Sequence, residues 1–245
     1  MPISGLLNIN KSAGITSFRA TELVRKCLAA DKAGHCGTLD PAAEGVMLVL
    51  FGRSTRFQDS LLSLPKVYRA RILFGLTTDS GDTTGKTTSV AEVPVNAFKD
   101  IGSILAKYTG EIEQIPPMFS ALKYGGKRLY EFARSGVTVP REKRKVTVYS
   151  FDLLGIDGNS IEVRIECSRG TYIRTLATDI GGEVGCGAAL QYLCRERVGP
   201  FDIASAVKIG RDLYPSRDAM LSCSIDEAQI GKIIDEAISG SGRHL

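Results

Sequence analysis

The chain has 245 residues, of which 43% are hydrophobic and 24% are charged, a composition typical of globular proteins. This length suffices for one large core with an insertion or a small extra lobe. No apolar run reaches the roughly 18 residues of a membrane helix, and the start, Met1 to Gly5, lacks the order of a signal peptide. We therefore expect a cytoplasmic protein without a membrane partner.

The six cysteines and two histidines show no metal-binding pattern. No Cys-x-x-Cys pair occurs, and zinc sites need such clusters of ligands. Free thiols are the default for a chain of this size in a reducing compartment. Cys36 has a histidine beside it in the sequence but no visible orienting partner, so we expect no catalytic role for it.

The N-terminal third is predicted to alternate strands and helices. Gly5 to Asn10 has the pattern of a short strand, and Thr16 can cap a helix whose apolar residues repeat up to Leu28. Six apolar residues from Val46 to Phe51 predict a buried strand. Residues 54–64 fit a helix that Pro65 ends.

Asp40 lies in the polar loop before this buried strand. Pro41 favours an extended backbone at Asp40, and Gly34 and Gly37 permit backbone angles that other residues resist. An irregular loop braced by a strand often carries catalytic groups. On the residues alone, a simple Asp-Pro turn with a local hydrogen bond is the more frequent arrangement, so both interpretations stay open.

The next segment begins with a strand from Lys66 to Leu76, in which Tyr68 starts an apolar face. Its ring can be buried there while its hydroxyl stays wet. Residues 78–85 form a polar loop whose two aspartates lack the spacing of a calcium loop. A strand near residues 89–93 and a helix from Pro94 to Leu105 follow.

Residues 118–145 carry a concentrated positive charge, although the whole chain has a net charge of only +4. Tandem prolines precede this segment, and Lys127 to Arg134 should form a short helix closed by Gly136. A basic patch on a near-neutral body is expected of a protein that binds phosphate backbones. Against two glutamates stand eight basic residues: Lys123, Lys127, Arg128, Arg134, Arg141, Lys143, Arg144 and Lys145.

The C-terminal half is predicted to hold a hairpin of residues 146–154 and 160–167, and then a helix from Ile173 to Val184. Arg174 falls in the first turn of that helix, at the unfavourable end of the helix dipole unless a carboxylate answers its charge. Asp40 is a candidate for that carboxylate, and an exposed arginine is the alternative. Helices predominate after Arg211. Strands interspersed with helices indicate an α+β chain.

Several motifs, in the expected order, resemble those of the bacterial tRNA pseudouridine-55 synthases, the TruB family. They are Gly34-His35-Cys36-Gly37-Thr38-Leu39-Asp40-Pro41-Ala42-Ala43-Glu44-Gly45, Lys66-x-Tyr68, the loop at 78–85, the block from Gln114 to Gly136, and Gly170-Thr171-Tyr172-Ile173-Arg174. The resemblance spans roughly residues 5–201. The chain departs from the family pattern at Ser12, where proline is usual, at Cys36, where threonine is usual, and at Ala189, where histidine is usual.

The resemblance implies a pseudouridine synthase fold, with a mixed and largely antiparallel central sheet flanked by helices. Residues 1–212 would form the catalytic domain, with residues 116–149 inserted as an RNA-binding thumb. Many relatives carry a further β-rich PUA domain. Residues 213–245 show too few strand signals for a complete one, and we expect a short helical tail.

The activity implied is isomerisation of uridine to pseudouridine in the T-loop of tRNA, at position 55, with no cofactor and no metal. The chain should bind the tRNA T stem-loop as a monomer without an obligate protein partner. Asp40 matches the catalytic aspartate, and Tyr68 and Arg174 are expected to act with it. The expected substrate-binding residues are His35, Tyr172, Leu193, Asp82, Lys123, Lys127, Arg128 and Arg134; for Asp82, ordering of its own loop is the alternative.

Two other functions stay open at this point. A non-catalytic chaperone of tRNA on the same fold would not need Asp40. A hydrolase with an aspartyl nucleophile would release free uracil, but the sequence lacks the paired carboxylates that glycoside hydrolysis generally uses. The sequence also leaves open whether Asp40 attacks the sugar, attacks the base or removes a sugar proton.

Overall fold

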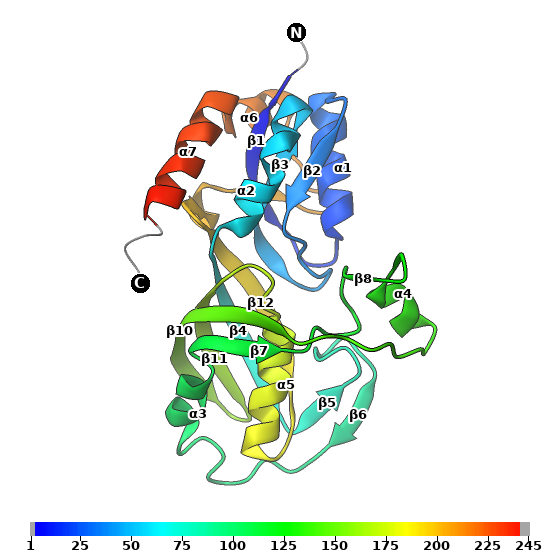
Figure 1. Cartoon of the computed structure of the whole chain (residues 1–245), viewed down its shortest axis with the longest axis vertical. Coiled ribbons are helices and arrows are strands. Elements are labelled where there is room, and N and C mark those ends of the chain that lie inside the picture. Colours follow the sequence, from blue (N-terminus) through cyan, green and yellow to red (C-terminus); the bar gives the residue numbers. More distant parts are fainter. Residues whose placement is uncertain (1–2, 241–245) are drawn as a thin grey trace. The chain divides into compact units, whose positions relative to one another are not determined.

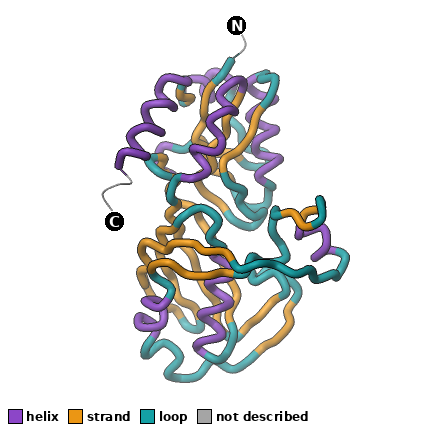
Figure 2. The backbone as a smooth tube through the Cα atoms, in the orientation of Figure 1, coloured by secondary structure: helices purple, strands orange, loops and turns teal. Residues whose placement is uncertain are grey.

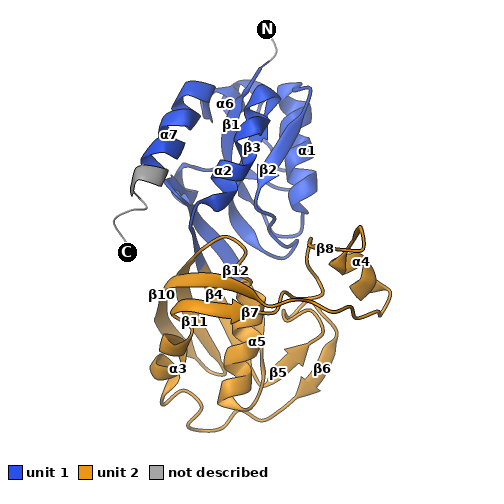
Figure 3. Ribbon diagram, viewed as in Figure 1, with its two compact units in different colours: residues 1–68, 193–245 blue, residues 69–192 orange. Residues whose placement is uncertain are grey.

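The computed structural model describes residues 3–240. Expectations that fall on residues 1–2 and 241–245 lie outside this range. The chain forms two compact units, which Figure 3 colours separately: unit 1 comprises Met1–Tyr68 and Leu193–Leu245, and unit 2 comprises Arg69–Tyr192. Strands β4 (Lys66–Phe74) and β12 (Ala188–Val198) run from one unit into the other. The predicted division at residue 212 stays a prediction.

The sheet of unit 1 is built around β1 (Gly5–Lys11) and β3 (Glu44–Phe51), both at the positions predicted. They pair antiparallel, with Leu6 opposite Leu50. Four shorter pairings extend this sheet: β2 (Ala33–Cys36) with β3, β14 (Val207–Ile209) and β15 (Ser224–Ile225) with β1, and β12 in parallel with β3. The sequence pattern did not predict β2.

The helices of unit 1 are α1 (Ser17–Leu28), α2 (Gln58–Ser63), α6 (Arg217–Ser222) and α7 (Glu227–Gly240), labelled in Figure 1. Thr16 caps α1 as predicted, accepting a hydrogen bond from the Arg19 amide at 3.0 Å. The single helix predicted for residues 54–64 is wrong in its first half, where the chain forms the 3-10 helix η1 (Gly52–Phe57). Ile230 and Ile234 of α7 belong to the same buried cluster as Leu6 and Leu50.

The sheet of unit 2 follows the predicted hairpin, now β10 (Arg144–Asp157) and β11 (Ser160–Cys167). Strand β7 (Gly110–Gln114) adds to β10, and the hydrogen-bonded order is β12-β4-β11-β10-β7. Figure 2 shows these strands in orange beside the purple helix α5 (Ile173–Val184), whose bounds match the prediction. The antiparallel sheet and its helices confirm the α+β class.

The short elements of unit 2 correct two predictions. Strand β4 ends at Phe74 because Gly75, at φ +82°, turns the chain into the ribbon of β5 (Leu76–Thr78) and β6 (Thr87–Val90). The helix expected from Pro94 begins only at Ile101, as α3 (Ile101–Lys107). Residues 95–100 form turns instead, and within them Phe98 packs edge-on against Phe74, with ring centroids 5.0 Å apart.

The thumb segment holds the ribbon of β8 (Lys123–Tyr124) and β9 (Lys127–Arg128), followed by α4 (Leu129–Arg134). The short helix predicted for residues 127–134 therefore starts two residues later than expected. Gly136, at φ +72°, follows it. In the part of the chain that the structure describes, no helix is long and apolar enough to cross a membrane.

Candidate active site

The loop that carries Asp40 connects β2 to β3 in unit 1 and is fixed on both sides of the aspartate. The Ser17 hydroxyl accepts a hydrogen bond from the Leu39 amide at 2.8 Å and also lies 2.9 Å from the Leu39 carbonyl oxygen, to which it donates. The Gly14 amide donates to the Pro41 oxygen at 2.8 Å. Asp40 itself is half-buried. Its loop is therefore irregular, as predicted, but held in one conformation by its neighbours.

Two buried cations, which the sequence analysis did not single out, brace the same loop. The Lys11 ammonium donates to the Ala43 oxygen at 2.6 Å and to three further main-chain oxygens, of Ser12, Ile15 and Pro41. Arg195 donates to the Gly37 oxygen at 2.9 Å and to the Val46 oxygen at 2.7 Å. Burial lowers the pKa of Lys11 from 10.5 to about 8, against the opposing effect of the Asp40 charge. The burial of Lys11 could have been predicted from the sequence, because Lys11 follows Leu7 and Ile9 at the period of two and so lies on the same face of β1.

Gly45, the last residue of the first motif, is required where β3 meets β12. Its φ is +109°, and a Cβ there would lie 2.2 Å from the Arg195 oxygen. Any other side chain would therefore push β12 away from β3 and move Arg195, which holds the Asp40 loop.

His35 and Cys36 end β2 with different surroundings. The His35 ring lies between two hydroxyls: Nδ1 is 3.1 Å from Thr21 Oγ1, and Nε2 is 3.2 Å from Thr38 Oγ1. Cys36 is fully buried, and its burial raises the pKa of the thiol to about 12. A thiol that keeps its proton at neutral pH is a poor nucleophile, in keeping with the expectation that Cys36 has no catalytic role.

Tyr68 and Leu193 complete the predicted site residues of unit 1. Tyr68 shares the buried face of β4 with Ala70 and Ile72, and only 9% of its surface is exposed. Leu193 is half-buried in β12. Both therefore present their side chains on strands of the central sheet.

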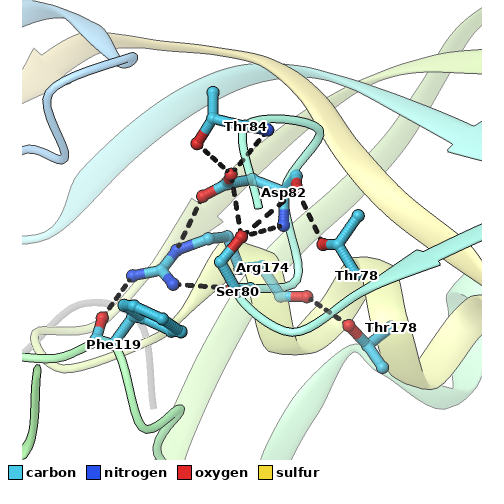
Figure 4. Close-up of polar contacts among 7 residues, drawn as sticks. All are labelled: Thr78, Ser80, Asp82, Thr84, Phe119, Arg174 and Thr178. Atoms are coloured by element: carbon cyan, nitrogen blue, oxygen red, sulfur yellow. Dashed lines mark hydrogen bonds and ion pairs between the residues drawn. The ribbon is translucent and has the colours of Figure 1, made fainter. Parts of the chain in front are cut away.

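Arg174 is the centre of a polar network in unit 2, drawn in Figure 4. Its guanidinium donates to the main-chain oxygens of Ser80, at 2.8 Å, and Phe119, at 2.7 Å. Its Nε lies 3.8 Å from Oδ2 of Asp82. A single buried side chain at the start of α5 thus holds both the 78–85 loop and the first part of the thumb segment.

Asp82 has its carboxylate engaged by its own loop. Oδ1 accepts from the Ser80 hydroxyl and the Thr84 amide, both at 3.0 Å. Gly81, at φ +76°, turns the backbone close to Arg174. These contacts are those of a residue that orders its loop, the alternative considered for Asp82; binding of substrate by Asp82 stays a prediction.

Tyr172 directly precedes α5, and its backbone is fixed by one side chain. The Gln114 amide group accepts from the Tyr172 N–H at 3.0 Å and donates to the Tyr172 oxygen at 3.3 Å. The structure therefore ties β7, where Gln114 lies, to the start of the helix that carries Arg174.

The four thumb cations lie around one small ribbon and helix. Lys123, Lys127 and Arg128 are exposed on β8 and β9. Arg128 and Arg134 both lie over the Tyr130 ring, with guanidinium carbons 5.9 and 5.2 Å from its centroid. The prediction of an exposed basic surface in this segment is confirmed.

The predicted residues thus fall into two local groups. Asp40 and His35 share a loop and strand of unit 1, whereas Arg174 and Asp82 interact in unit 2. The carboxylate that the structure places beside Arg174 within its own unit is Asp82. The predicted pairing of Arg174 with Asp40 stays a prediction.

The fold and the candidate site have the features expected of a pseudouridine synthase: a mostly antiparallel sheet with flanking helices, an aspartate in the loop before β3 and an exposed basic ribbon. The family model described as "TruB family pseudouridylate synthase (N terminal domain)" matches residues 25–173, and the "tRNA pseudouridylate synthase B C-terminal domain" matches residues 174–213. The chain belongs to the TruB family.

Named relatives support this assignment. The tRNA pseudouridine synthase B of Endomicrobium trichonymphae is 49% identical over 84% of this chain and 90% of its own length. That of Aromatoleum aromaticum is 47% identical over 84% of this chain and 67% of its own length. The two family models together cover residues 25–213, which include the Asp40 loop, the thumb and α5.

Solved structures show the same fold. A chain in the crystal structure of a Cbf5-Nop10-Gar1 complex is 31% identical with a TM-score of 0.65, over 84% of this chain and 52% of that chain. A chain in the structure of an H/ACA RNP bound to a substrate RNA containing 2'-deoxyuridine is 28% identical with a TM-score of 0.61, over 83% and 50%. This chain therefore spans about half the length of these solved chains.

Proposed function

We propose that this protein converts the uridine at position 55 in the T stem-loop of tRNA into pseudouridine, with Asp40 as its catalytic carboxylate. The observation that carries the proposal is the Asp40 loop, which lies within the region matched by the family and is held by Ser17, Lys11 and Arg195. A catalytic group held this rigidly needs little reorganisation when substrate binds.

The reaction is an isomerisation. The bond from ribose C1′ to uracil N1 breaks and a bond from C1′ to C5 forms, while C5 loses a proton and N1 gains one. No electrons are gained or lost overall, so the protein's own side chains suffice. The uridine must leave its stack to be reached, at a cost of a few kcal/mol, and loop nucleotides are the accessible targets in RNA.

The remaining predicted residues take supporting roles in this proposal. Tyr68 is the candidate for proton transfer at C5, and Tyr172, His35 and Leu193 are candidates for contact with the base. An arginine side chain stays charged and offers a planar fork of donors, which suits Arg174 to favour the ionised form of a carboxylate. The thumb cations bind RNA phosphates.

The test is release of tritium from tRNA labelled at uracil C5, measured side by side for the wild type and Asp40→Asn. We expect release by the wild type alone, with tRNA binding retained by the variant. Tight binding without release by either protein would instead indicate a tRNA chaperone, and free uracil among the products would indicate a hydrolase. We also expect the enzyme to be cytoplasmic and to act as a monomer. Sedimentation with and without tRNA tests the oligomeric state.

A further inference from the structure

The function proposed above does not account for a hollow beside the Asp40 loop, entirely within unit 1. It measures about 370 Å³ and lies among α1, β2 and α2. Gly37 and Thr38 of the Asp40 loop form part of its wall, so the hollow adjoins the loop that carries the catalytic aspartate. The side chains that matter for its chemistry are Phe18, Thr21, Glu22, His35, Gln58 and Leu62.

Phe18 gives the hollow an exposed aromatic surface. The residue is 71% exposed although it lies in the first turn of α1. A single exposed apolar residue is ordinary on a protein surface. Here the ring borders a concave site whose other walls are polar, and Leu62 adds an apolar wall. An aromatic face beside hydrogen-bonding groups is the arrangement on which unpaired nucleobases stack.

The polar wall is held in a defined orientation. The single hydroxyl proton of Thr21 points to the Ser17 oxygen at 2.8 Å, so Thr21 accepts from Nδ1–H of His35. Nε2, on the opposite edge of the ring, lies 3.2 Å from the Thr38 hydroxyl. The His35 ring is thereby held at both nitrogens by threonine hydroxyls of the protein itself.

Gln58 supplies an amide group to the same wall. Its Nε2 donates to the His35 oxygen at 3.3 Å, and no side chain or amide in the described chain donates to its Oε1. The amide group lies beside Gly34, where a Cβ would be 3.4 Å from Oε1, an ordinary van der Waals contact. The carboxylate of Glu22 is neutralised by Arg25, at 2.8 and 2.9 Å, which reduces its repulsion of an RNA strand.

We propose that this hollow binds one unpaired nucleobase of the substrate RNA, distinct from the uridine that reacts, stacked on Phe18 with its edge toward Gln58. The inference rests on the proposed function and extends it to a second base contact. The volume lies within the range of small-ligand pockets and accommodates one base with part of its ribose. Because the hollow adjoins the Asp40 loop, its base comes from the same RNA loop as the target uridine.

The experiment uses a set of T stem-loop RNAs, each with one abasic residue at a loop position other than the target. KM and kcat are measured for the wild type, Phe18→Ala and the control Tyr149→Ala, which removes another exposed aromatic ring outside the hollow. At one loop position, we expect the abasic residue to raise the KM of the wild type and of Tyr149→Ala by about tenfold, the effect of one lost stack. Phe18→Ala should show that tenfold KM already on the intact RNA, with no further rise at this position.

A second measurement does not depend on turnover. The fluorescent base 2-aminopurine replaces the base at that position, and RNA is bound to Asp40→Asn with or without Phe18→Ala. Stacking should quench the fluorescence only when Phe18 is present. Equal KM losses for wild type and Phe18→Ala at every position, or equal quenching in both proteins, would overturn the second base site. Absence of pseudouridine formation by the wild type on intact RNA would instead overturn the proposed function.

Discussion

The ammonium group of Lys11 donates to the main-chain oxygen of Ala43 at 2.6 Å, three residues after Asp40. Lys11 is fully buried, and a buried charge is costly unless hydrogen bonds satisfy it. Its three protons are shared among four main-chain oxygens, two of them in the Asp40 loop or at its end. The position of the proposed catalytic group therefore depends on the protonation of a lysine that does not itself need to touch the substrate.

The first prediction concerns pH. Burial lowers the pKa of Lys11 to about 8, so the ammonium loses a proton, and one donor, as pH rises through that value. We expect kcat of the wild type to fall above about pH 8 as the loop loosens. Lys11→Met should have a kcat lower by up to about 100-fold, the cost of a small misplacement of a catalytic group. A profile of kcat from pH 7 to 10 for both proteins, each normalised to its value at pH 7, isolates the effect of Lys11.

Stability should change in the opposite direction over the same window. The pKa of Lys11 is lower in the folded protein than the 10.5 of the unfolded chain, so the unfolded chain binds more protons between about pH 8 and 10.5. The contribution of Lys11 to the free energy of unfolding therefore rises with pH there. Urea unfolding of the wild type relative to Lys11→Met, measured across this pH range, gives that contribution.

For the preceding prediction on activity, parallel normalised kcat profiles in the two proteins would contradict the role of Lys11 in the loop.

The second prediction uses a departure from the family pattern. Ser12 stands where proline is usual, and its amide donates to the Ile209 oxygen at 2.8 Å, at the end of the pairing between β1 and β14. Ser12→Pro removes this donor, whereas Lys11 before it is already in a strand and tolerates a following proline. We expect the free energy of unfolding to fall by about 1 kcal/mol.

The control for this experiment is Ser12→Ala, which keeps the N–H group and should leave stability nearly unchanged. Amide hydrogen exchange at residues 207–209 gives a local measurement, because loosening of β14 should speed exchange there first. If Ser12→Pro instead raises the free energy of unfolding, the loss of the hydrogen bond to Ile209 costs less free energy than proline gains by restricting the unfolded chain.

Patterns confined to neighbouring residues predicted much of the fold. The apolar repeat of residues 173–184 gave the bounds of α5, and the alternation of residues 160–167 gave β11. The helix expected from Pro94 begins only at Ile101, and in the turns before it Phe98 packs on Phe74. This contact joins residues distant in sequence, and no local pattern contains that information.

The same limit applies to the candidate site. The motif around Asp40 identified the loop, but Arg195, which holds Gly37 from 158 residues away, lies in a strand without a distinguishing pattern. The position of Arg174 in a first helical turn indicated a carboxylate partner. The need of Arg174 for a carboxylate partner was predictable from the sequence. That Asp82 lies beside Arg174 was not, because this contact depends on the folding of the 78–85 loop onto α5.

The third prediction separates the charge of Asp82 from its hydrogen bonds. Asp82→Asn keeps an oxygen that can accept from Ser80 and Thr84 but removes the charge beside Arg174. Asp82→Ala removes both. We expect the free energy of unfolding to fall by about 1 kcal/mol for the asparagine variant and about 2–3 kcal/mol for the alanine variant, measured by urea unfolding. An asparagine variant as stable as the wild type would show that the carboxylate charge contributes nothing at Arg174.

The last prediction concerns the thumb. Lys123, Lys127 and Arg128 are exposed on the β8–β9 ribbon, and each phosphate contact releases a counterion from RNA. Replacing all three by glutamine should weaken tRNA binding. It should also reduce the magnitude of the slope of log K against log salt by about 2 to 3, because each of the three lost contacts contributes roughly 0.7 to 0.9. The measurement is a binding titration at several salt concentrations.

A matched control is the double variant Lys143→Gln, Lys145→Gln, in which both lysines already pair with glutamates, at 3.4 and 2.8 Å. Because these ion pairs leave little net charge for RNA, the control should keep nearly the wild-type slope; an equal drop in both variants would mean that overall charge, not the ribbon, governs binding.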